Sequence, residues 1–415
     1  MGKLQQFSIT FDESKDVFWA GECVKGHVVV QAAEDMKMKG LWLLFYGHSH
    51  VEWERGSGDD TITYKATETY FHHEVTLFGK ARGQTGDSVV LPTGRHVFPF
   101  QYQLLAEGLP SSFEGKHGYV RYIIKGTIYR PWKFDHTTKT AFTILDKSNE
   151  VLQEGLNRTH PHDLAQASTT PGCLCKSGPV ELQVQPDRSV YCPGEVMVIT
   201  GNLNNDSGDD VTSVEARLVQ IATFHGNYST FLQEKTKTID AKNIVQRVRI
   251  SGCKRGQSLA FSSSNGAALR VPPLPPPSLR FCKIIDIKYQ LDVVACVEGT
   301  LCSSSLKTQI PIKISPYRHH PHDSAPPPWG TPCPEPPTHP GPPPYTPGPA
   351  VINQPTAQVP SAPDLGFSFT APPSYAESEY GVSSIRDTDD TDYTMGEMNF
   401  APKYAYYDWS RHGQS

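Results

Sequence analysis

The first 146 residues alternate between apolar and polar side chains with a period of two, which is the pattern of half-buried β-strands. Phe7, Ile9 and Phe11 share one strand face, and the apolar block 41–46 is typical of a strand buried on both sides. Clusters of Gly, Asp and Pro separate the runs, and no stretch has a helical period. The pattern predicts an all-β N-terminal domain over residues 1–146, built as an immunoglobulin-like sandwich.

Residues 147–178 interrupt this pattern with His-Pro and Pro-Gly pairs, so we interpret them as a linker. Alternation resumes over 179–315. In the run 285–293, isoleucine, tyrosine, leucine and valine alternate with charged or amide side chains. The second region therefore predicts another β-sandwich, whose strands have one buried and one wet face.

The two halves share short segments in the same order. Val17–Glu22 resembles Val190–Glu195, and Val120–Lys125 resembles Ile287–Asp292. In each half the second segment follows the first at nearly the same interval. Matching segments in register predict a duplicated fold rather than two unrelated sandwiches.

The composition changes after residue 315. Hydrophobic residues make up only 37% of the chain, while the 36 prolines are well above average, and both deviations concentrate in this tail. A stretch with so little aliphatic content cannot bury enough surface to offset chain entropy, which predicts that residues 316–415 are disordered. The acidic residues between 387 and 392 are expected to be solvated, with binding to a partner as the alternative.

Two copies of the pattern Pro-Pro-x-Tyr lie in this tail. Consecutive prolines hold the backbone near polyproline II and present ring faces to an aromatic groove, the ligand type that WW domains bind. Chance predicts about 0.3 matches in a tail of this composition, so a pair favours a binding function over a proline spacer. The predicted WW-binding residues are Pro342, Pro343, Tyr345, Pro372, Pro373 and Tyr375.

Charge, cysteine content and the N-terminal sequence narrow the function class. A net charge of −5 and a pI near 6.3 argue against a nucleic-acid binder, which needs a strongly basic domain. The first residues lack the apolar run of a signal peptide, and no window reaches transmembrane length. Nine scattered cysteines without a secretory signal indicate reduced thiols. We therefore expect a cytoplasmic protein.

Motifs of catalysis are missing from the sequence. It contains no phosphate-binding loop, dinucleotide fingerprint or nucleophile elbow. His72-His73-Glu74 lacks the second histidine of a zincin, and Cys173-x-Cys175 lacks the paired Cys-x-x-Cys of a zinc site. We expect no enzyme activity, no catalytic residue, no metal and no cofactor.

Several cations are candidates for a basic surface that binds phosphorylated receptor tails or anionic lipid head groups. The alternative is that they belong to the solvent-exposed faces of ordinary strands. The candidates are Arg95, Lys116, Arg121, His117 and Arg130.

Five segments carry a resemblance to a known family: Leu91–Phe100, Pro110–Tyr122, Arg130–Trp132, Cys173–Pro179 and Val271–Arg280. Together with the tail motifs, they resemble the arrestin domain-containing proteins, the alpha-arrestins. The resemblance covers nearly the whole chain. It implies two arrestin-like β-sandwiches in tandem, joined by a short connector.

The resemblance also implies a function. A member of this family would be a non-enzymatic adaptor whose tail recruits WW-domain HECT-type ubiquitin ligases. The cargo would be membrane receptors or transporters, ubiquitinated and sorted while the adaptor associates peripherally with the plasma membrane or endosomes. The alternative is a trafficking scaffold of the vacuolar-sorting arrestin kind, which acts without ubiquitin ligases.

Overall fold

A computed structural model describes most of the two predicted domains and one segment of the tail. The described residues are 4–146, 164–169, 178–229, 234–277, 279–298, 304–315 and 382–407. Strands dominate throughout, and no helix among these residues is long and apolar enough to cross a membrane.

The N-terminal domain is a β-sandwich, as predicted. Strands β1, β3 and β8 form one sheet, and β6, β5, β10, β11 and β2 lie in that order in the facing sheet. The buried faces of both sheets meet in an apolar core that contains Phe7, Val28, Phe45 and Ile124. The elements are β1 (Leu4–Phe11), η1 (Asp12–Ser14), β2 (Val17–Trp19), β3 (Cys23–Ala32), β4 (Met36–Met38), β5 (Gly40–Arg55), η2 (Gly58–Asp60), β6 (Ile62–Gly79), β7 (Val89–Leu91), β8 (Gly94–Gln103), β9 (Phe113–Gly115), β10 (Gly118–Tyr129) and β11 (His136–Leu145).

The C-terminal domain is a second sandwich. One sheet has the order β12, β13, β15, β18, and the other contains β14, β21, β20 and β16, with β17 beside β16. The elements are β12 (Ala165–Thr169), β13 (Val180–Pro186), β14 (Val190–Tyr191), β15 (Val196–Asn205), β16 (Asp210–Ser229), β17 (Glu234–Cys253), β18 (Gln257–Phe261), η4 (Ser263–Asn265), β19 (Ala268–Arg270), β20 (Ile285–Glu298) and β21 (Ser304–Ile314).

Two expectations need correction here. The predicted linker 147–178 contains strand β12, which pairs with β13 and adds an edge to the C-terminal sheet. Its five residues are too few and too polar for an alternating pattern to be recognised, although Ala165 and Ala167 pack against the core, partly buried. Among the cysteines, Cys253, Cys282 and Cys296 are free thiols, but Cys23 is disulfide-bonded and is not the reduced thiol expected.

The predicted duplication extends to individual hydrogen bonds. The short strands β2 and β14 pair in parallel with the ends of β11 and β21. Glu22 accepts a hydrogen bond from the backbone of Trp19 at 3.0 Å, and Glu195 accepts the equivalent bond from Cys192 at 2.7 Å. The two halves thus close their sandwiches with the same turn.

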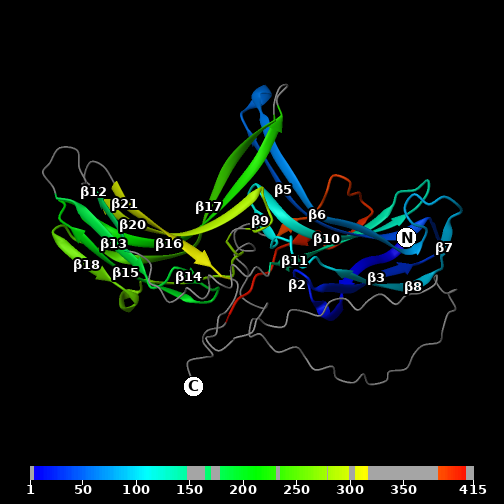
Figure 1. Cartoon of the computed structure of the whole chain (residues 1–415), viewed down its shortest axis with the longest axis horizontal. Helices are drawn as coiled ribbons and strands as arrows, with labels where there is room; N and C mark the ends of the chain where they lie inside the picture. Colours follow the sequence, from blue (N-terminus) through cyan, green and yellow to red (C-terminus); the bar gives the residue numbers. More distant parts are fainter. Residues whose placement is uncertain are drawn as a thin grey trace, which may run out of the picture.

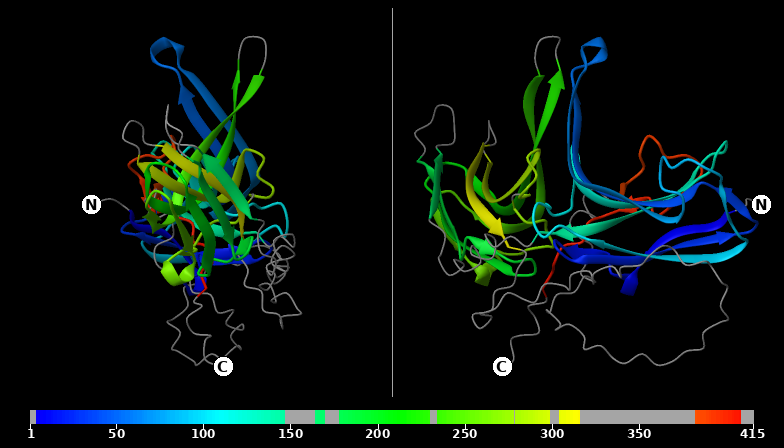
Figure 2. Two further views of the ribbon diagram at one scale, coloured as in Figure 1. Left: turned by 90° about the vertical axis from the view of Figure 1, so that its left-hand side faces the viewer. Right: turned by 45° about the vertical axis from the view of Figure 1, so that its right-hand side comes forward.

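The domains are joined by a continuous sheet, because β6 of the first pairs with β16 of the second at Lys65 and Asn227. At this junction the rings of Phe113 and Phe224 lie 6.4 Å apart. The ribbons β5–β6 and β16–β17 rise next to each other from the middle of an elongated body (Figures 1 and 2). The result is a two-lobed body with both long ribbons on one side.

Part of the tail is folded onto this body. Residues 382–407 contain the short strands β22 (Ser383–Ser384), β23 (Thr394–Gly396) and β24 (Asn399–Phe400), and they lie against the N-terminal domain in both views (Figures 1 and 2). Ile385, Phe400 and Tyr404 are buried. The prediction of disorder across 316–415 is therefore wrong for residues 382–407. Their few apolar side chains are buried by packing against the two domains. We call residues 382–407 the C-terminal segment.

Candidate functional site

The C-terminal segment extends the N-terminal sheet at one edge. Strand β23 pairs in parallel with β11, with Gly396 opposite Lys139. Gly396 has a φ of 100°, and a Cβ there would lie 2.2 Å from the Lys139 carbonyl oxygen, so only glycine fits this approach. The next residue, Glu397, donates its backbone N–H to the same carbonyl at 3.1 Å. Backbone pairing thus fixes the register of the segment on β11.

Apolar contacts hold the segment over the outer face of the sheet. Ile123 points away from the sandwich core, yet it is buried in a cluster with Ile385 and Phe400. Tyr46 and Met398 border this cluster. Without the segment, this patch of the sheet would expose apolar area to water, which is unfavourable by about 25 cal/mol per Å².

Two lysines form the charged centre of the site. Lys125 on β10 lies directly opposite Lys139 on β11, an arrangement that is unfavourable for like charges. The side chain of Lys139 is 0% exposed and forms ion pairs with Asp387 at 2.5 Å and Asp390 at 2.6 Å. Lys125 pairs with Asp389 at 2.6 Å. The acidic run of the tail therefore balances a pair of lysines that the N-terminal sheet cannot balance by itself.

The same contacts shift the pKa values of neighbouring groups. The hydrogen bond from Lys125 lowers the pKa of Asp389. Burial, together with the negative charge of Asp387, raises the pKa of Tyr46, whose hydroxyl donates to that carboxylate at 3.3 Å. His48 stacks on Tyr46, and burial lowers its pKa to about 4. Tyr46 and His48 are therefore neutral at physiological pH beside the charged pairs.

The far end of the segment contacts both domains. Lys403 forms an ion pair with Asp16 at 2.6 Å, and the buried Tyr404 hydroxyl donates to the Ser112 carbonyl at 3.0 Å. Tyr407 donates its backbone N–H to Pro193 of the C-terminal domain at 3.4 Å. The segment thus bridges the two lobes as well as covering β10 and β11.

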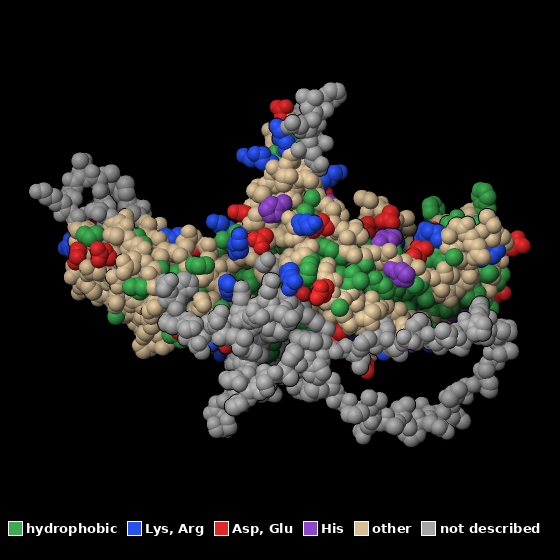
Figure 3. Space-filling model, viewed as in Figure 1, with side chains coloured by type: hydrophobic (Ala, Val, Ile, Leu, Met, Phe, Trp, Pro, Cys, Tyr) green, Lys and Arg blue, Asp and Glu red, His purple; other side chains and the backbone are tan. Residues whose placement is uncertain are grey.

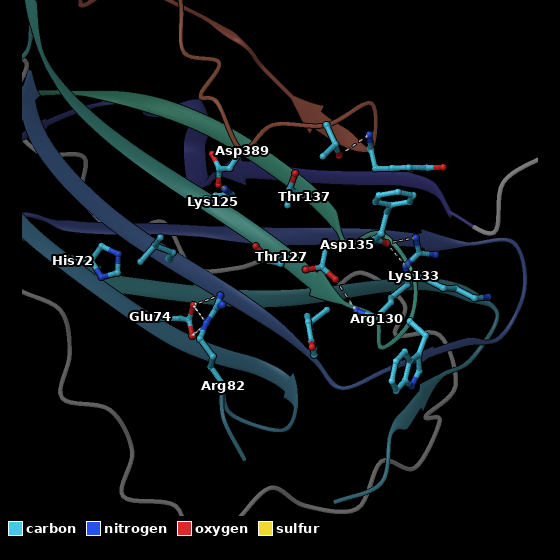
Figure 4. Close-up of a pocket in the computed structure, with 16 residues that line it drawn as sticks. His72, Glu74, Arg82, Lys125, Thr127, Arg130, Lys133, Asp135, Thr137 and Asp389 are labelled. Atoms are coloured by element: carbon cyan, nitrogen blue, oxygen red, sulfur yellow. Dashed lines mark hydrogen bonds and ion pairs between the residues drawn. The ribbon is translucent and has the colours of Figure 1, made fainter. Parts of the chain in front are cut away.

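A groove of about 1220 Å³ lies beside the segment, over the outer face of β5, β6 and β10. Figure 4 shows Arg82 bonded to Glu74 on one side of it and Asp389 next to Lys125 on the other. Arg130, Lys133 and Asp135 border it from the β10–β11 turn (Figure 4). The groove combines paired charges in its walls with further cations at one end.

Comparison with known proteins decides the family. The model "Arrestin (or S-antigen), N-terminal domain" matches residues 7–150, and "Arrestin (or S-antigen), C-terminal domain" matches 176–318. This chain belongs to the arrestin domain-containing proteins. Its two arrestin domains are the sandwiches described above.

Curated relatives agree with this assignment. Arrestin domain-containing protein 4 of Mus musculus is 29% identical over 324 residues, which are 75% of this chain and 72% of that protein. Arrestin domain-containing protein 17 of Caenorhabditis elegans is 29% identical over 314 residues, 72% of this chain and 69% of that protein. Thioredoxin-interacting protein of Homo sapiens is 26% identical over 301 residues, 72% of each chain.

One residue of the predicted basic surface, Arg121, does not lie at the surface of this arrestin fold. Arg121 is buried and bonds both carboxylate oxygens of Glu114 at 2.6 and 2.9 Å, so its charge is already paired and withdrawn from the surface. Arg95 is the second residue of β8, whereas Lys116 lies between β9 and β10. His117 packs against the ring of Phe224.

Other predicted residues lie elsewhere or remain untested. Arg130 borders the groove, apart from the other four candidates. Both Pro-Pro-x-Tyr motifs lie outside the described residues. The sequence prediction missed Lys139; the acidic run in the tail is visible in the sequence, but nothing there indicates that it would pair with this lysine.

The acidic run also has the composition of a cation site. Asp387, Asp389 and Asp390 bring carboxylate oxygens within 4.8 Å of one another. The ammonium groups of Lys125 and Lys139 already contact all three carboxylates. Their chemistry is thus that of an ion-pair network, and we assign no metal to it.

Proposed function

We propose that this arrestin domain-containing protein is a non-enzymatic adaptor that recruits WW-domain HECT-type ubiquitin ligases to membrane receptors or transporters. The outcome would be ubiquitination, endocytosis and sorting of the cargo. The protein would be cytoplasmic and associate peripherally with the plasma membrane and endosomes. Membership of the family supports the adaptor role, and the details beyond it are our proposal.

The observation that carries the ligase proposal is the pair of Pro-Pro-x-Tyr motifs between two anchored points of the chain. Before them, Ser315 donates its backbone N–H to Tyr191 at 2.8 Å in the C-terminal domain. After them, the C-terminal segment begins at residue 382 on the N-terminal domain. A ligase bound at Tyr345 or Tyr375 would therefore be tethered to the body from both sides.

The spacing of the motifs supports binding to tandem WW domains. Tyr345 and Tyr375 are 375 − 345 = 30 residues apart, which corresponds to roughly 30 Å for a flexible chain. Two motifs at this reach can bind two WW domains of one ligase, with avidity gains of about 10²–10⁴ over a single motif. The second motif would thus convert a weak contact into stable recruitment.

The test measures binding of the full-length protein to a purified tandem WW module. We expect Tyr345→Ala or Tyr375→Ala to weaken binding by about 10²-fold or more and the double variant to abolish it. Tyr380→Ala is the matched control, because Tyr380 lies in the same tail but outside both motifs. Wild-type affinity in the double variant would reject ligase recruitment and favour a scaffold that acts without ligases.

A further inference from the structure

An exposed tryptophan occupies a strained position at the β10–β11 turn. Lys133 donates its backbone N–H to the Arg130 carbonyl at 3.2 Å, with Pro131 and Trp132 between them. Trp132 has a φ of 66°. This is the third position of a type II turn, which normally requires glycine or asparagine. A bulky aromatic in the left-handed region costs folding free energy.

Burial does not offset this strain. Trp132 is 102% exposed, and its neighbour Phe134 is 68% exposed. Strain that is held without a packing benefit is a pointer to function. A glycine would satisfy the turn better, so the fold alone does not account for tryptophan here.

Hydrogen bonds hold the backbone of the turn, and a ring stack holds the Phe134 side chain. Arg130 donates its backbone N–H to Asp135 at 3.0 Å and a guanidinium N–H to the Phe134 carbonyl at 3.0 Å. The Phe134 ring stacks on Tyr393 of the C-terminal segment, with centroids 5.5 Å apart. Trp132 is thus presented on a fixed platform.

Exposed apolar surface gathers around this point. Tyr129 and Tyr393 border the same groove as Trp132 and Phe134, and all four side chains are exposed. Figure 3 shows hydrophobic side chains projecting at the outer end of the N-terminal domain. Single exposed apolar residues are ordinary, but a cluster of this kind marks an interaction surface.

The turn carries two cations, Arg130 and Lys133, and one carboxylate, Asp135, so its net charge is positive. Within the described residues, the Lys133 ammonium group has no ion pair, and Arg130 bonds a carbonyl rather than a carboxylate. The other cations of the groove, Arg82 and Lys125, are already paired with carboxylates. Lys133 and Arg130 are thus the cations left to attract an anionic partner.

We propose that the turn Arg130–Asp135 is a peripheral membrane contact, in which Trp132 and Phe134 enter the interface of an anionic bilayer and Lys133 and Arg130 bind its head groups. Tryptophan is enriched at the membrane–water interface because its ring is amphipathic, and lysine and arginine next to it add attraction to anionic lipid. The turn lies at the outer end of the domain, on the side from which both ribbons project (Figures 1 and 2).

This inference deepens the proposed function by naming the surface that would meet the membrane. The contact is small and would be weak by itself, so it would act together with cargo binding, as linked weak contacts do. The test of the membrane contact uses only protein and lipid. A failure of ligase recruitment would therefore not affect its result.

The experiment is co-sedimentation of the full-length protein with phosphatidylcholine vesicles, with and without phosphatidylserine, an anionic lipid of the cytoplasmic leaflet. We expect binding to the anionic vesicles that weakens as salt is raised. Trp132→Gly should lower the partition coefficient about ten-fold, from the loss of aromatic burial. Since glycine relieves the turn, the variant should melt no lower than wild type, which separates lost binding from lost folding.

Charge variants test the second half of the proposal. Lys133→Glu should lower binding to anionic vesicles roughly twenty-fold and leave binding to neutral vesicles unchanged. Lys288→Glu is the control of equal charge change, on an exposed lysine of the C-terminal domain. Phe281→Gly is the control for Trp132→Gly, because Phe281 also has a positive φ, 72°, but lies in a C-terminal turn and is only 36% exposed.

Three outcomes would overturn the proposal. Wild-type protein could fail to sediment with any vesicle, which would leave the aromatic cluster to a protein partner. Trp132→Gly and Lys133→Glu could bind like wild type, which would assign the membrane contact to another surface. Equal losses in both control variants would show that the effect is not local to the turn.

Discussion

The N- and C-terminal domains share a fold but differ in charge at one matched pair of positions. In the first, Lys125 and Lys139 lie directly opposite each other on β10 and β11. In the second, Asp292 and Gln309 lie directly opposite each other on β20 and β21, and the Gln309 amide donates to the Asp292 carboxylate at 3.1 Å. Lys307 completes the C-terminal arrangement with an ion pair to Asp292 at 2.7 Å.

The match between these positions rests on equivalent hydrogen bonds. Tyr122 donates its hydroxyl to the Pro110 carbonyl at 2.6 Å, and Tyr289 donates to the Pro275 carbonyl at 2.7 Å. Lys125 and Asp292 follow these tyrosines by three residues each. In the C-terminal sheet, the charge at this position is paired by neighbouring residues of the same sheet. In the N-terminal sheet, the two lysines are paired by the acidic C-terminal segment.

The largest loss of stability should come from removing the buried charge of Lys139. Lys139→Met leaves Asp387 and Asp390 without their cation, and breaking a buried ion pair in this way costs about 3–5 kcal/mol. The segment can detach and expose both aspartates to water, which limits this cost. We therefore expect protease to cleave within 382–407, and we expect a lower free energy of unfolding. Gln309→Met, the same replacement at the matched and exposed position of β21, should change neither. If both variants were cleaved equally and lost equal stability, the proposed difference in charge balance between the domains would be refuted.

The two buried tyrosines test whether the matched hydrogen bonds stabilise both domains. Tyr122→Phe and Tyr289→Phe each leave a buried carbonyl without its donor, which costs about 1–3 kcal/mol in the free energy of unfolding. The loss should be larger for Tyr289, because its hydroxyl also accepts from Gln220 at 3.0 Å. Denaturant unfolding of the two variants measures the difference, and a larger loss for Tyr122→Phe would contradict this ranking.

Acid should destabilise the N-terminal domain before the C-terminal one. Burial lowers the pKa of His48 and of His136 to about 4, from an ordinary value near 6.5. Between these values the unfolded chain takes up protons that the folded domain does not, so stability is present above pH 6.5 and falls as the pH drops toward 4. We expect a loss of about 1–2 kcal/mol over this window, after allowance for solvent screening.

Urea unfolding at pH 7.5 and 4.5, followed by a probe in each domain, measures this loss. The double variant His48→Gln/His136→Gln should flatten the pH dependence of the N-terminal domain. Stability that rises as the pH is lowered would show that these histidines are not neutral in the fold.

The smallest loss of stability should come from removing the exposed ion pair between Lys125 and Asp389. Asp389 is 65% exposed at its side chain, and an exposed pair with Lys125 contributes below about 1 kcal/mol, less at high salt. Asp389→Asn should therefore weaken docking of the segment only slightly, as measured by amide exchange of β23. Asp286→Asn, in the surface pair with Lys288, is the C-terminal control. A loss as large as that of Lys139→Met would mean that Asp389, and not the buried lysine, holds the segment.

The sequence predicted what is encoded locally. Period-two patterning gave both sandwiches, and the repeated segments around Glu22 and Glu195 gave the duplication, because strand burial and turn chemistry depend on near neighbours. The paired charges of β10 and β11 are not local in this sense. Lys139 and Asp387 are 387 − 139 = 248 residues apart, and neither is unusual within its own stretch.

Two errors have the same physical origin. Both sequence interpretations of Arg121 left it at the surface, but it forms an ion pair with Glu114 on β9 and the two charges are buried together. Composition placed all of 316–415 in a disordered tail, but Ile385 and Phe400 find their apolar partner in Ile123 on β10. In both cases the burial of a residue depends on a segment that its own surroundings in the sequence do not reveal.

The central claim is that the C-terminal segment is docked on the N-terminal sheet through Lys139. Hydrogen exchange of the full-length protein tests it at the amides of Ile385 and Glu397, which donate to the carbonyls of Met398 and Lys139 at 2.8 and 3.1 Å. We predict slow exchange at both amides in the wild type and fast exchange in Lys139→Met. Exchange of these amides at the unprotected rate in the wild type would contradict the account.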